Sequence, residues 1–522
     1  MRYLYTVLLL IFITQLISCR KDFETSLSTG ELLFSQDTIF FDRVFDDISS
    51  STHRFTVKNK SNKDITIPNI SFERGVNSFY RMNVDGIVGK QLEDVSILAK
   101  DSIYIFVEVT VDFDQVTDVD FMYRDRILFD SGANEQKVVL ESLVLDVHLI
   151  RPDRTAIDDG FTYEQIVLQE APSSGGEDIT IRGTNLIENT TWNNDKPYLI
   201  YNYVGVPSGK TLTIEAGTRL YFHQNSGIIV QEGGKLIVNG ALSTTEDLEN
   251  QVIFQGDRLE DDFAEISGQW GTIWLMDGST NSEINYATIK NATIGLFIDS
   301  NNSSQTLSLN NTQIYNTTSF GIYARNAKVT VKNTVISNNA DASLSIALGG
   351  TYDFYHSTIA NYWQNSSRSN PTIMLQDSYE SATALYAAPL QANFTNCIIY
   401  GNQKIELFID NLDSGTAFDF NFTNCLLKFD DTNNDYEDKP LYDFTDASLY
   451  QNIILNNKPI FYNTDSSEGR IDLIVGDNSP VINQADVSVL TDGILQKDIL
   501  GEDRSIGNSD IGAYQHITFP ED

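Results

Sequence analysis

FTNCII (Phe394–Ile399) and FTNCLL (Phe422–Leu427) are two copies of one six-residue phrase, and four earlier segments follow the same pattern. These segments are INYATI, LNNTQI, VKNTVI and FYHSTI, which end at Ile289, Ile314, Ile336 and Ile359. Successive ends are 25, 22, 23, 40 and 28 residues apart. A period of this size is typical of proteins in which stacked structural units share one continuous core.

Each position of the phrase predicts a part of the backbone path. The first position is always large and apolar: Ile284, Leu309, Val331, Phe354, Phe394 and Phe422. The third position carries mostly asparagine, which tolerates a left-handed bend: Tyr286, Asn311, Asn333, His356, Asn396 and Asn424. The fourth position is small. We therefore expect two strands that meet at a tight corner, with the corners stacked so that their asparagines hydrogen-bond in a ladder. No helix-period segment accompanies the repeat, which favours a parallel β-solenoid over helical repeat arrays.

The repeat resembles the right-handed parallel β-helix proteins of the pectate-lyase-like group. GKTLTIEAGTRLYF (Gly209–Phe222) and QWGTIWL (Gln269–Leu275) resemble the opening turns of that group. DILGEDRSIGNSDIGAYQ (Asp498–Gln515) resembles the terminal segment of β-helix proteins with a choice-of-anchor Q domain. The resemblance implies a β-helix over residues 185–515, a connector and cap over 151–184, and a tail over 516–522. It leaves the chemistry open, because the group contains lyases, hydrolases and adhesins.

Residues 31–150 carry a different pattern. Segments such as HRFTVKN (His53–Asn59) and DSIYIFVEVTVD (Asp101–Asp112) alternate apolar and polar residues between polar turns. This period of two predicts an antiparallel β-sandwich, and the region resembles the immunoglobulin-like spacer domains of cell-surface proteins. The predicted fold class is therefore all-β, with an immunoglobulin-like β-sandwich followed by a right-handed parallel β-helix.

The N-terminus predicts export. Residues 1–18, MRYLYTVLLLIFITQLIS, contain an apolar run that is short for a bilayer span and typical of a secretory signal peptide. Leu16-Ile17-Ser18-Cys19 resembles the lipobox of bacterial lipoproteins, which implies lipidation of Cys19 and a tether over residues 19–30. The expected location is the cell envelope, as a surface-exposed outer-membrane lipoprotein that meets the membrane through its N-terminal lipid. An ordinary signal peptide with an incidental cysteine is the alternative.

Charge narrows the classes of partner. The chain has 35 basic and 72 acidic side chains, and its formal net charge is −37. Such a charge repels phosphate backbones, so we expect no nucleic-acid partner. It also disfavours polyanionic glycans unless calcium bridges them.

One face of the predicted coil carries aromatic residues. The alternation of strands places Trp274, Phe297 and Tyr323 in an outward-facing stripe, with Asp299 and Arg325 beside it. Aromatic rings flanked by charged hydrogen-bonding groups suit a sugar ring, so this face is a candidate polysaccharide-binding site. Trp363 is a further candidate glycan-binding residue and lies in the 40-residue interval after Ile359, where an insertion either forms one wall of a groove or packs its own aromatic residues as a capping loop. A stripe covered by other parts of the chain is the alternative.

The leading functional prediction is therefore a surface lipoprotein whose β-helix binds glycans or mediates adhesion without catalysis. The alternative is a polysaccharide lyase or glycoside hydrolase that acts in a groove on the same face. Hydrolases need clustered carboxylates, and the mapped face offers only Asp299. Lyases need a strong base, for which Arg325 is the candidate. A purely structural surface rod is the third possibility.

Two further features are candidate sites. Asp431, Asn433, Asp435 and Glu437 place oxygen ligands at alternate positions, as a calcium loop requires, although a solvated acidic loop explains them as well. No other cofactor is predicted. Cys397 and Cys425 occupy equivalent repeat positions, so both are expected to face the core, either as small core residues or as a disulfide.

Overall fold

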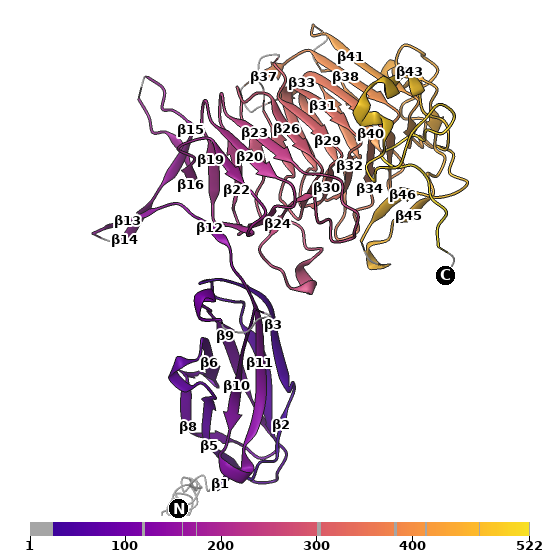
Figure 1. Cartoon of the computed structure of the whole chain (residues 1–522). Helices are drawn as coiled ribbons and strands as arrows, with labels where there is room; N and C mark the ends of the chain where they lie inside the picture. Colours follow the sequence, from indigo (N-terminus) through magenta and orange to yellow (C-terminus); the bar gives the residue numbers. More distant parts are fainter. Residues whose placement is uncertain are drawn as a thin grey trace, which may run out of the picture. The chain divides into compact units, whose positions relative to one another are not determined.

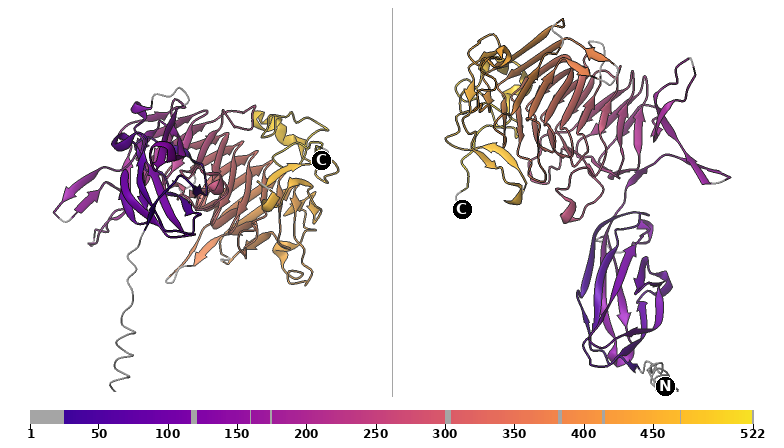
Figure 2. Two further views of the ribbon diagram at one scale, coloured as in Figure 1. Left: turned by 90° about the horizontal axis from the view of Figure 1, so that it is seen from below. Right: turned by 180° about the vertical axis from the view of Figure 1, so that it is seen from behind.

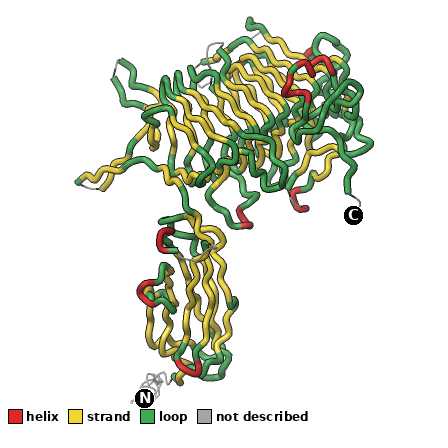
Figure 3. Tube along the Cα trace, in the orientation of Figure 1, coloured by secondary structure: helices red, strands yellow, loops and turns green. Residues whose placement is uncertain are grey.

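The computed structural model describes residues 25–116, 121–158, 160–173, 175–299, 304–380, 384–412, 415–468 and 470–520. Within these ranges strands dominate, and the helices are short 3-10 segments (Figure 3). These are η1 (Gly75–Asn77), η2 (Phe113–Gln115), η3 (Gly132–Asn134), η4 (Asp261–Phe263), η5 (Pro440–Tyr442), η6 (Ser466–Glu468), η7 (Val487–Thr491) and η8 (Gly493–Gln496). No helix of the described residues is long and apolar enough to cross a bilayer. The predicted signal peptide and Cys19 lie outside the described residues.

The chain divides into two compact units, residues 1–146 and residues 147–522, which we call the two-sheet unit and the coiled unit (Figure 1). Each is described by itself.

The two-sheet unit contains two sheets with one apolar core. One sheet consists of β1 (Ser26–Leu27), β3 (Thr38–Phe45), β5 (Ile65–Phe72), β8 (Gln91–Ile97), β10 (Met122–Phe129) and β11 (Gln136–Leu145). The other consists of β2 (Leu32–Phe34), β4 (His53–Asn59), β6 (Tyr80–Val84), β7 (Ile87–Gly89) and β9 (Ser102–Val109). In β9 the side chains of Ile103, Ile105 and Val107 are buried while Tyr104 and Phe106 are exposed, which confirms the predicted period of two.

The coiled unit is built on two sheets of mostly parallel strands. The long sheet consists of β15 (Gln165–Gln169), β16 (Ile179–Asn185), β17 (Thr190–Trp192), β19 (Tyr203–Val206), β20 (Thr211–Glu215), β22 (Gly227–Val230), β23 (Lys235–Asn239), β25 (Ile273–Leu275), β26 (Ser282–Asn285), β28 (Leu296–Ile298), β29 (Leu307–Asn310), β31 (Ile322–Lys332), β33 (Leu344–Tyr355), β35 (Ile373–Gln376), β38 (Leu390–Thr395), β40 (Leu407–Asp410), β41 (Phe418–Thr423) and β43 (Tyr450–Gln451). The second sheet consists of β12 (His148–Ile150), β18 (Tyr198–Ile200), β21 (Arg219–Phe222), β24 (Val252–Gly256), β27 (Ala287–Lys290), β30 (Gln313–Thr317), β32 (Val335–Asn339), β34 (Thr358–Asn361), β39 (Ile398–Gly401), β42 (Leu426–Leu427) and β44 (Ile454–Leu455).

Three hairpins project from these sheets or pack on them: β13 (Arg154–Ile157) with β14 (Gly160–Tyr163), β36 (Ser378–Glu380) with β37 (Leu385–Ala387), and β45 (Phe461–Asn463) with β46 (Asp472–Val475).

Strands of the coiled unit pair with the strand one turn further along the chain, so equivalent residues form columns (Figure 2). The first positions of the repeated phrase form one buried column of paired residues: Ile284, Leu309, Val331, Phe354, Phe394 and Phe422. The rings of Phe354, Phe394 and Phe422 stack within it, with centroids 4.8 Å apart at each step. Stacked apolar columns explain why a single turn cannot fold alone.

The predicted corners are confirmed at the third position of the phrase. Asn311, Asn333 and Asn424 have φ of 49°, 48° and 48°, which is the left-handed region. The expected ladder forms at single steps: Asn333 Nδ2 donates to Asn311 Oδ1 over 2.9 Å, and Asn452 Nδ2 donates to Asn424 Oδ1 over 3.1 Å, whereas Asn424 Nδ2 donates to the carbonyl of Gln484. A second ladder runs along a parallel column, where Asn316 Nδ2 donates to Asn291 Oδ1 over 2.7 Å. Asparagine adopts the left-handed conformation, and its side-chain amide can hydrogen-bond to the asparagine on the next turn.

Two boundaries differ from the sequence-based expectation. Residues 148–150, expected to end the sandwich, form β12 and pair with β18 of the coiled unit. After Leu455 the described chain no longer adds parallel strands and instead forms the β45–β46 hairpin and 3-10 segments. The alternating apolar residues Ile471, Leu473 and Val475 pack on the outside of the second sheet. Their period of two therefore reflects packing against the coil, and this segment does not form another turn of the coil.

Candidate functional site

The long sheet places the predicted aromatic stripe in strict register. Ile229 of β22 pairs with Trp274 of β25, Trp274 pairs with Phe297 of β28, and Phe297 pairs with Tyr323 of β31. The residues on either side of each ring face the core and are fully or almost fully buried, as with Ile273 and Leu275 around Trp274. All three rings are partly exposed. We call Trp274, Phe297 and Tyr323, together with Asp299 and Arg325, the aromatic face.

The rings of the aromatic face touch one another. Trp274 and Phe297 stack at a centroid distance of 5.0 Å and an interplanar angle of 12°. Tyr323 is tilted by 58° to Phe297 at 5.5 Å, so more of its ring surface turns away from the stack. The indole Nε1 of Trp274 is buried and has no acceptor among the described residues. Trp274 therefore offers apolar surface to a ligand and not a hydrogen-bond donor.

Asp299 and Arg325 form an ion pair across neighbouring turns. Arg325 Nη2 donates to Asp299 Oδ2 over 2.5 Å, and the guanidinium carbon lies 5.0 Å from the centroid of the Phe297 ring. Burial raises the pKa of the neighbouring Tyr323, and the positive charge of Arg325 opposes that shift. Because the Asp299 carboxylate is held by Arg325, it is poorly placed to act as a general acid.

Met374 and Phe408 are neighbours that the sequence pattern was not used to place on this face. The Trp274–Phe297–Tyr323 column continues through Ser345 and Met374 to Phe408. The β36–β37 hairpin carries the cross-strand pair Tyr379 and Tyr386, both exposed, and Tyr379 is close enough to Tyr323 to add to the rise in its pKa that burial causes. The same alternation of inward and outward residues, continued along the chain to β35 and β40, would have found Met374 and Phe408.

Trp363 does not belong to the aromatic face, and the prediction that it binds glycan is wrong. Its side chain is 5% exposed, and its indole Nε1 donates to Ser366 Oγ over 2.8 Å. The main chain of Trp363 is held by Asn361 and Asn402. The start of the inserted segment therefore packs against the coil, and no ring face of Trp363 is available for stacking.

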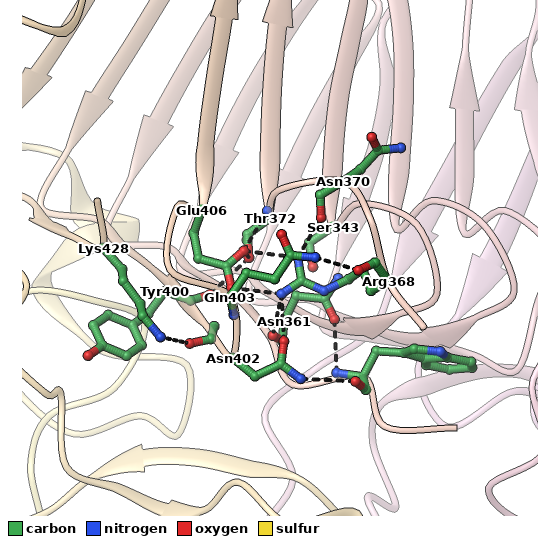
Figure 4. A network of polar contacts seen from close by, with 12 residues as sticks. Ser343, Asn361, Arg368, Asn370, Thr372, Tyr400, Asn402, Gln403, Glu406 and Lys428 are labelled. Carbon is green, nitrogen blue, oxygen red and sulfur yellow. Dashed lines mark hydrogen bonds and ion pairs between the residues drawn. The ribbon is translucent and has the colours of Figure 1, made fainter. Parts of the chain in front are cut away.

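The same segment is fixed by a buried ion pair (Figure 4). The side chains of Arg368 and Glu406 are 2% and 0% exposed, and Arg368 Nη2 lies 2.7 Å from Glu406 Oε1. Glu406 also accepts hydrogen bonds from the backbone N–H and hydroxyl of Thr372 and from the backbone N–H of Gln403. Both carboxylate oxygens of Glu406 accept hydrogen bonds from donors of this chain. The cluster therefore stabilises the fold and is not a reactive site.

The outer surface of the second sheet is covered by the chain itself. Val335, Ile398 and Leu426 point outward from that sheet, yet they are buried beneath residues of the C-terminal segment, among them Ile499 and Tyr514. The long sheet differs, because the rings of its aromatic face remain partly exposed. The two faces of the coiled unit are thus unequally available to a partner.

In the acidic loop proposed to bind calcium, the carboxylate of Asp431 is hydrogen-bonded to the backbone of the loop itself. Asp431 Oδ1 and Oδ2 accept hydrogen bonds from the backbone N–H groups of Asp435 and Tyr436. Within the described residues, no group of three or more His, Cys, Asp or Glu side chains is arranged to hold a metal ion. The geometry therefore lends no support to the calcium prediction for Asp431, Asn433, Asp435 and Glu437.

Cys397 and Cys425 are both buried free cysteines, so the core reading is confirmed and the disulfide alternative is wrong. Burial, the largest cause, raises the pKa of the Cys397 thiol well above its usual value. A thiol in this state is a poor nucleophile.

Comparison with known proteins shows no family for this chain. No protein-family model matches it, and no curated protein matches it. One similar solved structure is a family 123 glycoside hydrolase from Clostridium perfringens, with 8% identity and a TM-score of 0.16 over 21% of this chain and 23% of that chain. Another is a protein of unknown function from Porphyromonas gingivalis W83, with 11% identity and a TM-score of 0.16 over 24% of this chain and 55% of that chain. At these scores neither likeness assigns a fold or an activity to this chain, which is placed here in the all-β class.

Proposed function

We propose that this protein is a surface-exposed lipoprotein in which an immunoglobulin-like sandwich carries a right-handed parallel β-helix, and that the aromatic face of the β-helix binds a glycan strand. The proposal of lipidation at Cys19 rests on the lipobox-like sequence. The β-helix assignment is supported by the parallel columns and left-handed corners of the coiled unit.

One observation carries the binding proposal: Trp274, Phe297 and Tyr323 lie in register on consecutive turns and remain partly exposed. Consecutive turns of parallel strands are about 4.8 Å apart, so the three rings form a narrow apolar ridge along the coil axis. A strand of sugars can lie along such a ridge with its C–H groups against ring edges and ring faces. Arg325 and Asp299 lie beside the ridge and can pair with hydroxyl groups.

Binding without catalysis is favoured over the lyase or hydrolase alternative. The carboxylate of the aromatic face is Asp299, which is paired with Arg325. A hydrolase would need a second carboxylate about 5–10 Å away, and no other residue of the aromatic face supplies one.

The test is glycan-array binding of the full chain, compared with Trp274→Ala and with Tyr104→Ala, which removes an exposed aromatic ring of the two-sheet unit. We expect wild type and Tyr104→Ala to bind the same glycans, and Trp274→Ala to lose at least about fivefold in affinity, since one aromatic contact contributes about 1 kcal/mol or more. Equal binding by all three proteins would reject the aromatic face. Failure of wild type to bind any glycan would favour a structural rod.

A further inference from the structure

A cavity of about 580 Å³ lies where the β15 strand meets the outer surface of the long sheet. One wall is formed by residues that follow the equivalent strands of three successive turns. These are Ser208 after β19, Gln231 and Glu232 after β22, and Met276 and Asp277 after β25. Val167, Gln169 and Glu170 of β15 and its C-terminal end close the other side. The volume is within the range of small-molecule sites, about 300–1,000 Å³.

The β15 strand closes the column of the aromatic face at this end. Ile166 and Ile229 are both fully buried, although Ile229 points outward from the sheet in the same column as Trp274. Ile166 of β15 lies close to the backbone of the coil, because a Cβ at Gly183 would lie 2.6 Å from Ile166 Cδ1 and a Cβ at Gly205, the next residue of the column, would lie 3.1 Å from it. Gln231 Nε2 donates to the carbonyl of Val167 over 3.2 Å and ties β15 to the coil. A ligand that lies along the aromatic face therefore meets a wall beside Trp274.

The cavity adjoins the aromatic face along a neighbouring column. The backbone N–H of Met276 donates to Val230 O, and that of Asp299 donates to Leu275 O, so Met276 and Asp299 occupy equivalent positions on successive turns. Met276 lines the cavity, and Asp299 belongs to the aromatic face. One ligand can therefore contact both.

The lining residues select the charge of a ligand. Glu170, Glu232 and Asp277 are acidic, Gln169, Gln231 and Ser208 are polar and neutral, and none of the ten lining residues is basic. Carboxylates accept hydrogen bonds from hydroxyl groups, amides both donate and accept, and Met276 offers an apolar surface. The same carboxylates repel uronate or sulfate groups.

We propose that this cavity holds the terminal residue of a neutral glycan chain whose following residues lie along the aromatic face. This inference rests on the proposed function, and it adds that the ligand is uncharged and is recognised at a chain end. The wall formed by β15 blocks the path of a longer chain, so the glycan has to end there. The acidic lining excludes acidic sugars.

The experiment measures binding of the full chain to neutral hexasaccharides (cellohexaose, maltohexaose and mannohexaose) and to hexagalacturonate by calorimetry. Glu170→Gln and Gln169→Ala alter the cavity wall, while Glu177→Gln changes an acidic, exposed residue of the same loop that does not line the cavity. We expect at least one neutral hexasaccharide to bind wild type and Glu177→Gln equally. The double variant Gln169→Ala/Glu170→Gln should bind it about tenfold more weakly, because the hydrogen bond of Gln169 is lost and the charge-assisted hydrogen bond of Glu170 is replaced by a weaker neutral one.

The possible failures are distinguishable. If wild type binds a neutral hexasaccharide, Trp274→Ala weakens that binding, and the double cavity variant does not, the chain-end pocket is rejected while the proposed function stands. If hexagalacturonate binds as well as the neutral chains, the charge selection is rejected. If no saccharide binds wild type, the proposed function itself fails.

Discussion

Asn333 shows how much of this fold depends on single corner residues. Its φ of 48° is left-handed, its side chain is fully buried, and its Nδ2 donates to Asn311 and to the carbonyls of Ile494 and Lys497. Its Oδ1 accepts a hydrogen bond from the buried guanidinium of Arg504 over 2.7 Å. One side chain thus joins two turns of the coil to the C-terminal segment.

Asn333→Ala should lower the free energy of unfolding by about 3 kcal/mol, because it strains a left-handed residue and leaves buried polar groups without partners. Asn333→Gly removes the same hydrogen bonds but tolerates the backbone, so it should recover about 1 kcal/mol of that loss. Chemical denaturation of both variants measures the difference. Equal stability of the alanine variant and wild type would contradict the role assigned to this corner.

His356 occupies the asparagine position of its turn and adds a dependence on pH. It is fully buried with φ of 45°, and its Nε2 accepts a hydrogen bond from Asn396 Nδ2 over 2.8 Å. Burial, and next the positive charge of Arg504, hold the pKa of His356 well below its usual 6.5. The folded protein therefore keeps a neutral imidazole, whereas the unfolded chain binds a proton below about pH 6.5.

Stability from His356 should be complete above about pH 6.5 and should fall as the pH drops further, since the unfolded state then binds more protons than the folded state. Between about pH 7.5 and about pH 5.5 this costs about 1.4 kcal/mol. His356→Asn, which restores the residue found at most other corners, should remove that part of the pH dependence. Denaturation curves of both proteins at the two pH values test this, and parallel losses in both would contradict it.

At the scale of elements, the inserted segment between β34 and β39 depends on the Arg368–Glu406 pair. Removing one partner leaves the other charge buried, so Arg368→Met should cost about 3–5 kcal/mol. In Arg368→Met/Glu406→Leu neither charge remains. The double variant should therefore lose about 1–3 kcal/mol less unfolding free energy than the losses of the two single variants added together. A thermodynamic cycle by chemical denaturation measures this coupling. Strictly additive losses would show that the two side chains do not stabilise each other.

Sequence patterns predicted those elements whose geometry follows from local chemistry. The corners could be placed because the left-handed bend selects asparagine, and the inward columns could be placed because every turn repeats the same alternation. The positions of Trp274, Phe297 and Tyr323 followed from that register. The alternation also predicted strands in residues 31–150, of which those up to Leu145 belong to the two-sheet unit.

Elements whose place depends on distant contacts could not be predicted in the same way. Trp363 is buried, and its backbone is held by Asn402, far along the chain; no local pattern encodes that contact. The C-terminal segment alternates like a strand of the coil, so Ile471, Leu473 and Val475 read as a further turn. The outward apolar residues Val335, Ile398 and Leu426 were the available signal, because apolar outward positions require a cover.

At the scale of the molecule, the coiled unit covers one outer surface with its own C-terminal segment and leaves the aromatic face partly exposed. The formal net charge of −37 disfavours nucleic acids and acidic glycans as partners. The β15 wall, the acidic cavity beside it and the ridge of rings together favour an uncharged, hydroxyl-rich chain.

Oxidative footprinting of tryptophan tests the central claim most directly. Of the four tryptophans, Trp192, Trp270 and Trp363 are 4%, 1% and 5% exposed, whereas Trp274 is partly exposed. Mass spectrometry should therefore find Trp274 oxidised most in the free protein and protected when a glycan that the wild-type chain binds is present, with Tyr104 modified equally in both states. Oxidation of Trp274 that is unchanged by the bound glycan would contradict the account.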